Sequence, residues 1–125
     1  MIATLASLSR VIDAFFFSRD HLQWLDVSNN KLTSIEPAIT NFPNLVILYM
    51  HGNEIAKLKE INKLGTLKFL KKLTLHANPI EEVRNYRMHV CTVMPRLTML
   101  DFIDMTKLDR DRAQTWDALK CKPKY

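Results

Sequence analysis

One spacing of apolar residues recurs between residues 22 and 80 and limits the folds that this chain can adopt. Leucine-like residues occupy positions one, four, six and eleven of each copy, and an asparagine occupies position nine. The copies are Leu22, Leu25, Val27, Asn30 and Leu32; Leu45, Leu48, Met50, Asn53 and Ile55; and Leu70, Leu73, Leu75, Asn78 and Ile80. Chance rarely keeps so many positions in phase three times, so the pattern predicts a structural repeat.

The spacing within each copy has a physical reason. Positions four and six alternate with solvent-facing neighbours, as a short strand with one buried face requires. The chain must then turn, and an asparagine amide can bond loop backbone groups that no strand satisfies. We therefore expect Asn30, Asn53 and Asn78 to form a structural ladder inside the coil.

A fourth, partial copy follows at Leu97, Leu100 and Phe102, with Met105 in place of the asparagine. It predicts a strand over residues 98–102, with Phe102 at the inward position six. A methionine side chain cannot replace the amide, so we expect the asparagine ladder to end there.

These copies carry the leucine-rich-repeat signature, which predicts an α/β solenoid. We expect a short parallel sheet of about four strands on the concave face, helices and turns on the convex face, and helical caps at both ends. The expected organisation is an N-terminal capping helix over residues 1–21, repeats over 22–80, the last repeat and C-terminal cap over 81–105, and a C-terminal helix with a basic tail over 106–125. Within the cap, Asn85 is a good N-cap for a helix that Pro95 stops.

Bulk composition narrows the class. The chain has 125 residues, 47% of them hydrophobic and 25% charged, which fits one globular domain. No apolar run approaches the roughly 20 residues of a membrane helix. Cys91 and Cys121 are interpreted as free thiols in a reducing compartment, which predicts a cytoplasmic protein. No membrane partner is expected.

Positive charge is concentrated in one segment. The net charge is +5, and this basic patch consists of Lys57, Lys59, Lys63, Lys68 and Lys71, followed by Lys72 and opposed only by Glu60. One interpretation is a solvated convex face. The other is attraction to an acidic partner such as tubulin or a nucleic acid.

The strand positions that point away from the helices predict a protein-binding concave face. Its candidate residues are Trp24, Asp26, Ile47, Tyr49, His51, Lys72, Thr74, His76, Met99 and Asp101. Aromatic residues such as Trp24 and Tyr49 are common anchors of protein interfaces, although exposed apolar residues also occur without a function. His51 and His76 occupy equivalent positions of adjacent strands, so their rings are expected to touch. Two histidines are too few for a zinc site, and no metal is expected.

The sequence offers no parts for catalysis. With two glycines in the chain there is no glycine-rich phosphate loop, and no GxSxG motif occurs. Cys91 is interpreted as a core thiol rather than a nucleophile. We expect neither enzymatic activity nor a cofactor nor a small-molecule substrate.

Several segments carry a resemblance to a known family. LDVSNNKLTSI (25–35), LYMHGNEI (48–55) and LTLHANPIEE (73–82) resemble the short SDS22-like class of leucine-rich repeats. The pattern YRxxVxxxxPxLxxLD over residues 86–101 looks like the C-terminal cap of that class. TKLDR (106–110) and KPK (122–124) are less generic and resemble a group associated with cilia and axonemes. Members of that group look longer at the N-terminus.

This resemblance implies a non-enzymatic interaction adaptor, a structural, microtubule-associated component of cilia with tubulin or other axonemal proteins as partners. One alternative is a ribonucleoprotein assembly subunit similar to the spliceosomal leucine-rich-repeat protein, although a nucleic acid is the less favoured partner. A phosphatase regulator of the SDS22 kind is a further alternative, which rests on the repeat class alone.

Overall fold

The computed structural model describes residues 21–35 and 37–120. They form a five-stranded sheet in the order β1-β2-β3-β4-β5, in which the first four strands are parallel and β5 is antiparallel to β4. The strands are β1 (Trp24–Asp26), β2 (Ile47–Tyr49), β3 (Lys72–Thr74), β4 (Met99–Leu100) and β5 (Ile103–Asp104). The N-terminal capping helix predicted from the sequence lies outside the described residues, apart from His21.

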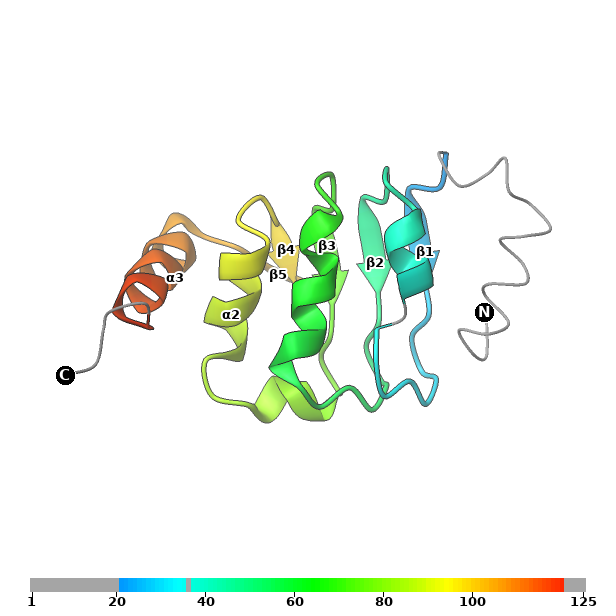
Figure 1. Ribbon diagram of the computed structural model, residues 1–125, viewed down its shortest axis with the longest axis horizontal. Helices are drawn as coiled ribbons and strands as arrows, with labels where there is room; N and C mark the ends of the chain where they lie inside the picture. Colours follow the sequence, from blue (N-terminus) through cyan, green and yellow to red (C-terminus); the bar gives the residue numbers. More distant parts are fainter. Residues whose placement is uncertain (1–20, 36, 121–125) are drawn as a thin grey trace.

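Helical segments cover one face of the sheet and leave the other bare (Figure 1). They are the 3₁₀ helices η2 (Pro37–Asn41), η3 (Leu58–Thr66) and η4 (Pro79–Glu82) and the α-helix α2 (Tyr86–Val93). The last helix, α3 (Lys107–Lys120), lies beyond the end of the sheet and packs against α2 (Figure 1). Short 3₁₀ turns suit repeats this short, because each must cross the convex side within a few residues. The predicted leucine-rich-repeat solenoid is confirmed.

The strands pair in the register that the repeat predicts. Ile47 of β2 lies opposite Trp24 on one side and Lys72 on the other, and Lys72 lies opposite Met99. All four are position-three residues. Position four consequently faces the helices throughout, and the side chains there are at most 7% exposed. Burying each such leucine contributes about 1.5–3 kcal/mol, which fixes the register against a one-residue slip.

Each turn after a repeat strand passes through a left-handed residue at position eight. The φ angles are 56° at Asn29, 73° at Gly52 and 57° at Ala77. Glycine is required at position 52 for two reasons. Its φ angle is positive, and an added Cβ would collide with Oδ1 of Asn29. The left-handed residue reverses the chain so that the following asparagine points inward.

Asn53 bonds the backbone of two successive turns. Its amide nitrogen donates to the carbonyl oxygens of Val27 (3.1 Å) and Met50 (2.8 Å). Its side-chain oxygen accepts from the amides of Asn30 (3.1 Å) and Leu32 (3.2 Å). This one buried side chain therefore satisfies donors and acceptors that the short strands leave unpaired.

Asn78 repeats the arrangement one coil later. Its amide nitrogen donates to the carbonyls of Met50 (3.0 Å) and Leu75 (2.8 Å), and its oxygen accepts from the amide of Ile55 (3.0 Å). Asn30 is half-buried, and its amide donates to a carbonyl within its own turn at 2.9 Å. The three asparagines thus form a ladder whose inner members link adjacent coils.

The fourth copy departs from the predicted strand over residues 98–102. β4 ends at Leu100, and Asp101 (φ 54°) and Phe102 (φ 63°) form a two-residue turn that leads into the antiparallel β5. Left-handed backbone at both central positions is that of a type I′ hairpin turn. The prediction that Phe102 faces inward is wrong, because the reversal leaves its ring 54% exposed; Met105 is buried instead.

The start of α2 also differs from its prediction. Asn85 does precede the helix, but its backbone is left-handed (φ 65°) and its side chain makes no capping hydrogen bond. Asparagine tolerates this conformation better than most residues. Its role here is to turn the chain from η4 into α2.

α3 begins with a capping box and is tied to α2. The Thr106 amide donates to Asp109 Oδ2 (2.9 Å), and the Asp109 amide donates to Thr106 Oγ1 (3.1 Å). The Arg87 guanidinium donates to both carboxylate oxygens of Asp109, at 3.3 and 3.1 Å. Within the described residues, no helix combines the length and apolar character that crossing a bilayer requires.

Replacing Asn53 by leucine is expected to destabilise the fold strongly, because it leaves turn amides and carbonyls without partners. Each orphaned group costs about 1–3 kcal/mol. Asn41, which is exposed, provides the matched control. Urea denaturation measures how much each of Asn53→Leu and Asn41→Leu lowers the free energy of unfolding. Equal decreases in the two variants would contradict the proposed role of the asparagine ladder.

The Arg87–Asp109 contact predicts a stability that weakens in acid. The hydrogen bond from Arg87 and then the Thr106 amide lower the pKa of Asp109 below its ordinary value of 3.8. A lowered carboxylate pKa stabilises the fold above the ordinary value and loses this contribution as pH falls below it. Asp109→Asn is expected to cost about 1–2 kcal/mol at neutral pH, since both side chains keep some contact with solvent.

Urea denaturation of the wild-type protein and of Asp109→Asn, repeated from about pH 7 down to about pH 2, tests this dependence of stability on pH. The difference between wild type and Asp109→Asn is expected to shrink as pH falls through the ordinary pKa. The exposed Asp111 of the same helix gives the control Asp111→Asn, which is expected to change little. A difference independent of pH would show that the charge of Asp109 is not responsible.

Candidate protein-binding face

Three aromatic rings lie in a row on the concave face. Trp24 comes from β1, Tyr49 from β2 and Phe102 from the turn after β4. The Trp24 and Tyr49 ring centres are 6.4 Å apart with nearly perpendicular planes, and Tyr49 and Phe102 are 5.4 Å apart. Trp24 is 56% exposed and Phe102 54%. The row is therefore a solvent-facing aromatic surface supported by a sheet.

A stacked histidine pair extends this surface. The His51 and His76 rings are 4.7 Å apart and almost parallel, with an angle of 6° between them. Phe102 lies against both, at 6.0 Å from His51 and 5.6 Å from His76. Tyr49 lies 6.0 Å from His51. Phe102 consequently bridges the aromatic row and the histidine pair.

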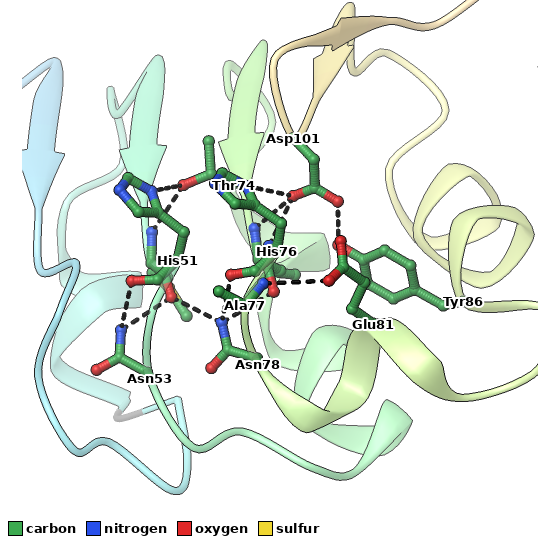
Figure 2. A network of polar contacts seen from close by, with 11 residues as sticks. His51, Asn53, Thr74, His76, Ala77, Asn78, Glu81, Tyr86 and Asp101 are labelled. Atoms are coloured by element: carbon green, nitrogen blue, oxygen red, sulfur yellow. Dashed lines mark hydrogen bonds and ion pairs between the residues drawn. The ribbon is translucent and has the colours of Figure 1, made fainter.

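Thr74 supports this surface from below. It is only 1% exposed, and its hydroxyl oxygen accepts from the Met50 amide at 3.1 Å and lies 2.8 Å from His51 Nδ1. Figure 2 shows the hydroxyl between the strand backbone and the imidazole. The expectation that Thr74 contacts a partner is corrected to a positioning role, because the residue is buried and its hydroxyl is already engaged by the Met50 amide and His51.

Asp101 has the same supporting role at the C-terminal end. Its Oδ1 accepts from the amides of Leu75 (2.6 Å) and His76 (2.9 Å), and its Oδ2 accepts from the Tyr86 hydroxyl (2.8 Å). The carboxylate thus points into the protein rather than toward a partner (Figure 2). His76 Nδ1 lies 3.5 Å from Asp101 Oδ1, too far for a good hydrogen bond. Within the described residues this buried nitrogen has no hydrogen-bond partner.

The remaining predicted residues lie around the aromatic surface. Ile47 and Met99 are half-buried, and Lys72 is exposed in the same position-three row as Trp24. Asp26 is half-buried, and its Oδ1 accepts from the Ser28 amide at 2.9 Å. The concave face is accordingly apolar at its centre with isolated charges beside it.

The lysines of the basic patch are not equivalent. Lys57, Lys59, Lys68 and Lys71 are exposed. Lys63 is exposed as well, but it donates to Glu60 Oε1 (2.9 Å) and to the carbonyl oxygen of Ile35, just before η2 (3.0 Å). Burial would raise the pKa of Glu60, but the hydrogen bond from Lys63 and other contacts outweigh it and the pKa is lowered. Lys63 therefore stabilises the fold.

The described residues offer little support for two other kinds of site, a reactive cysteine and a metal site. Cys91 is 4% exposed, and burial raises the pKa of its thiol, which favours the unreactive protonated form. In the described ranges, no group of three or more His, Cys, Asp or Glu side chains is placed to hold a metal ion. Cys121 lies outside those ranges.

The sequence pattern of the family described as "Leucine-rich repeat" matches residues 8–123. The chain belongs to the leucine-rich-repeat family. Leucine-rich repeat-containing protein 51 of Rattus norvegicus is 45% identical over 120 residues, which are 96% of this chain and 62% of that protein. The human protein of that name is 49% identical over 105 residues, 84% of this chain and 55% of its own length. The chain thus spans about 55–62% of these two relatives.

One further relative is named as a ribonucleoprotein protein. A Caenorhabditis elegans protein named probable U2 small nuclear ribonucleoprotein A′ is 36% identical over 107 residues, 84% of this chain and 42% of its own length. The Drosophila melanogaster SNF/U2A′ complex contains a similar chain, with a TM-score of 0.74, 28% identity, and coverage of 81% of this chain and 63% of that one. The Mex67 leucine-rich-repeat domain of Chaetomium thermophilum (TM-score 0.67, 22% identity, coverage of 86% and 76%) shares the fold.

Sequence reasoning missed Phe102, the ring that bridges the aromatic row and the histidine pair. The repeat phase assigns it to the core, and Asp101-Phe102 lacks the glycine that usually marks a type I′ turn. A bulky residue with positive φ is a backbone outlier. The available signal is the loss of the asparagine in the fourth copy, where Met105 replaces it, because a copy without the asparagine lacks the residue that forms the repeat turn.

The histidine pair predicts a measurable pH dependence. Burial and then the neighbouring His76 lower the pKa of His51 below its ordinary 6.5, although Asp26 and Asp101 oppose this. The lowered pKa means that the contribution of neutral His51 to stability is complete above about pH 6.5 and is lost as pH falls. An NMR titration of the imidazole signals is expected to place the His51 midpoint below 6.5.

His76→Gln provides the matched comparison for this titration. Removing the His76 imidazole eliminates one of the two causes that lower the pKa of His51. The titration midpoint of His51 is therefore expected to move upward toward its ordinary value. A wild-type His51 that titrates above 6.5 would contradict the arrangement of the pair.

Proposed function

We propose that this chain is a non-enzymatic adaptor that binds a protein partner on its concave face and acts as a structural component of cilia. The observation that carries the binding role is the exposed row of Trp24, Tyr49 and Phe102 on a sheet whose register is fixed. Large aromatic side chains on rigid supports lose little entropy on binding and are enriched among the residues that dominate interface energies.

The conformation of Phe102 supports a role in binding. A bulky side chain in the left-handed region costs of order 1–3 kcal/mol, and such strain is concentrated at functional sites. In return, the turn brings the ring onto the concave face, against Tyr49 and both histidines. We infer that Phe102 is a contact residue rather than a packing residue, because 54% of it remains exposed.

The ciliary setting rests on the family resemblance of TKLDR and KPK and on the similarity to leucine-rich repeat-containing protein 51. In this proposal the adaptor is cytoplasmic and microtubule-associated. The exposed lysines of the basic patch would add long-range attraction to an acidic axonemal partner such as tubulin.

A second candidate function is assembly of a ribonucleoprotein. It is favoured by the similarity to the probable U2 small nuclear ribonucleoprotein A′ and to the chain in the SNF/U2A′ complex. Here too the concave face would hold a protein, so the two candidates differ in the identity of the partner and in location.

Localisation of the tagged protein in ciliated cells, combined with affinity purification and mass spectrometry, separates the candidates. Axonemal staining and recovery of axonemal proteins are expected. Nuclear retention with splicing proteins recovered would favour the second candidate, and diffuse staining excluded from cilia would contradict the first.

Alanine at any of the three aromatic positions is expected to weaken binding of the recovered partner. Trp24→Ala, Tyr49→Ala and Phe102→Ala should each cost about 2 kcal/mol or more, mainly as faster dissociation with little dependence on salt. Surface plasmon resonance with the purified partner measures both the rates and the salt dependence.

Leu119→Ala provides the control, because Leu119 is 59% exposed, close to the 56% of Trp24, but lies on α3. Its effect on binding is expected to be small. Wild-type affinity in all three aromatic variants, with folding verified by circular dichroism, would refute the concave-face proposal.

A further inference from the structure

We propose a second interaction surface, separate from the concave face, which takes a hydrophobic side chain from an acidic segment of a partner protein. It lies where the chain leaves η3 and α2 and turns toward β3 and β4, along the upper edge in Figure 1. We call it the basic-edge pocket and define it by Leu67, Val93, Met94 and Leu97 with Lys68 and Arg96.

The size and lining of the pocket suit a side chain rather than a cofactor. Its volume is about 260 Å³, below the roughly 300–1,000 Å³ of sites for small molecules. Leu67, Met94 and Leu97 are themselves buried, and Val93 is half-buried at the edge of the core. An aliphatic or aromatic side chain of a partner would therefore extend the core of the last repeats.

The charge beside the pocket has one sign. No acidic residue occurs from position 61 to 80 or from 88 to 100, whereas lysines or arginines stand at 63, 68, 71, 72 and 96. Lys63 is neutralised by Glu60. Lys68 and Arg96 are exposed and make no ion pair or side-chain hydrogen bond with the part of the chain that the structure describes.

Other cations near this end are used inside the fold. Arg87 is paired with Asp109, and Arg110 donates to the Leu97 carbonyl at 3.3 Å. Lys68 and Arg96, which line the apolar pocket, are thus available to an outside anion. Charge complementarity selects a partner with carboxylates flanking a hydrophobic residue.

The lining favours a polypeptide over a nucleic acid. None of the residues that line the pocket is aromatic, and binding of single strands relies on aromatic rings on which bases stack. The lining residues also share no member with the candidate residues of the concave face. Both surfaces can accordingly be occupied at the same time, and the loss of one leaves the other intact.

A pair of matched peptides tests the proposal on the complete chain. The probes are acetyl-Glu-Asp-Glu-Phe-Glu-Asp-Glu-amide and the same peptide with serine in place of phenylalanine, each titrated into isotope-labelled protein and followed by NMR. We expect amide shifts concentrated in residues 65–70 and 93–97. The phenylalanine peptide is expected to bind roughly tenfold more tightly, because only it buries apolar surface.

Charge reversal tests the basic residues. The double variant Lys68→Glu with Arg96→Glu is expected to bind the phenylalanine peptide roughly tenfold or more weakly. Raising the salt concentration is expected to weaken binding to the wild type in the same way. Lys31→Glu with Arg84→Glu makes the same change in net charge at exposed positions outside the basic patch, and is expected to change affinity by less than about twofold to threefold. The NMR spectrum of each variant reports whether it is folded.

Three results would overturn the proposal, and each can be read on the wild-type chain or on the control. They are equal affinity for the two peptides, shifts spread over all lysines or centred on the concave face, and equal losses in the two double variants. Tighter binding of polyuridylate RNA with the same shifts would assign the pocket edge to nucleic acid instead. None of these outcomes depends on Trp24, Tyr49 or Phe102, so this test and that of the concave face can fail independently.

Discussion

The fold depends on satisfying the backbone of the turns that follow three-residue strands. Strands this short pair few of their own amides and carbonyls. Each left-handed turn at position eight adds further backbone groups that no strand can pair. Asn53 alone bonds the carbonyls of Val27 and Met50 and the amides of Asn30 and Leu32. A leucine side chain would fill the space but leave these groups buried and unpaired, so the asparagine position constrains the repeat more strictly than the apolar positions, which accept Leu, Val, Met or Ile.

The features that follow from this constraint could be read from the sequence. A fixed spacing places equivalent residues opposite one another in a parallel sheet, so the contact of His51 with His76 and the proximity of Trp24 to Tyr49 follow from their shared or neighbouring positions. The side of the sheet that carries the helices follows in the same way from positions four and six. Local periodicity is sufficient here because each repeat contacts mainly its neighbours.

The features that escaped prediction all lie where the repeat ends or where side chains reach across coils. At Phe102 the phase of the repeat indicated a buried side chain, but a hairpin competes with a fourth full coil and the hairpin is formed. Thr74 is buried, and its hydroxyl is engaged by the Met50 amide and His51 of the neighbouring coil. Lys63 pairs with Glu60 three positions away, but its contact with the Ile35 carbonyl joins residues 28 positions apart, and no local pattern encodes that contact. The lysine cluster therefore looked more uniform in the sequence than it is in space.

Asp101 connects the end of the solenoid to its concave face. Its carboxylate repeats the contact of Thr74 one coil later, since Thr74 accepts from the Met50 amide and Asp101 accepts from the amides of Leu75 and His76. The same group accepts from Tyr86, whose pKa is raised by burial and by Asp101, so that the hydroxyl remains protonated and keeps donating. The left-handed backbone at Asp101 also starts the turn that presents Phe102. One residue thus binds the backbone after β3, anchors α2 and sets the aromatic surface. The stability of the C-terminal cap and the geometry of the binding face are therefore two consequences of the same contacts.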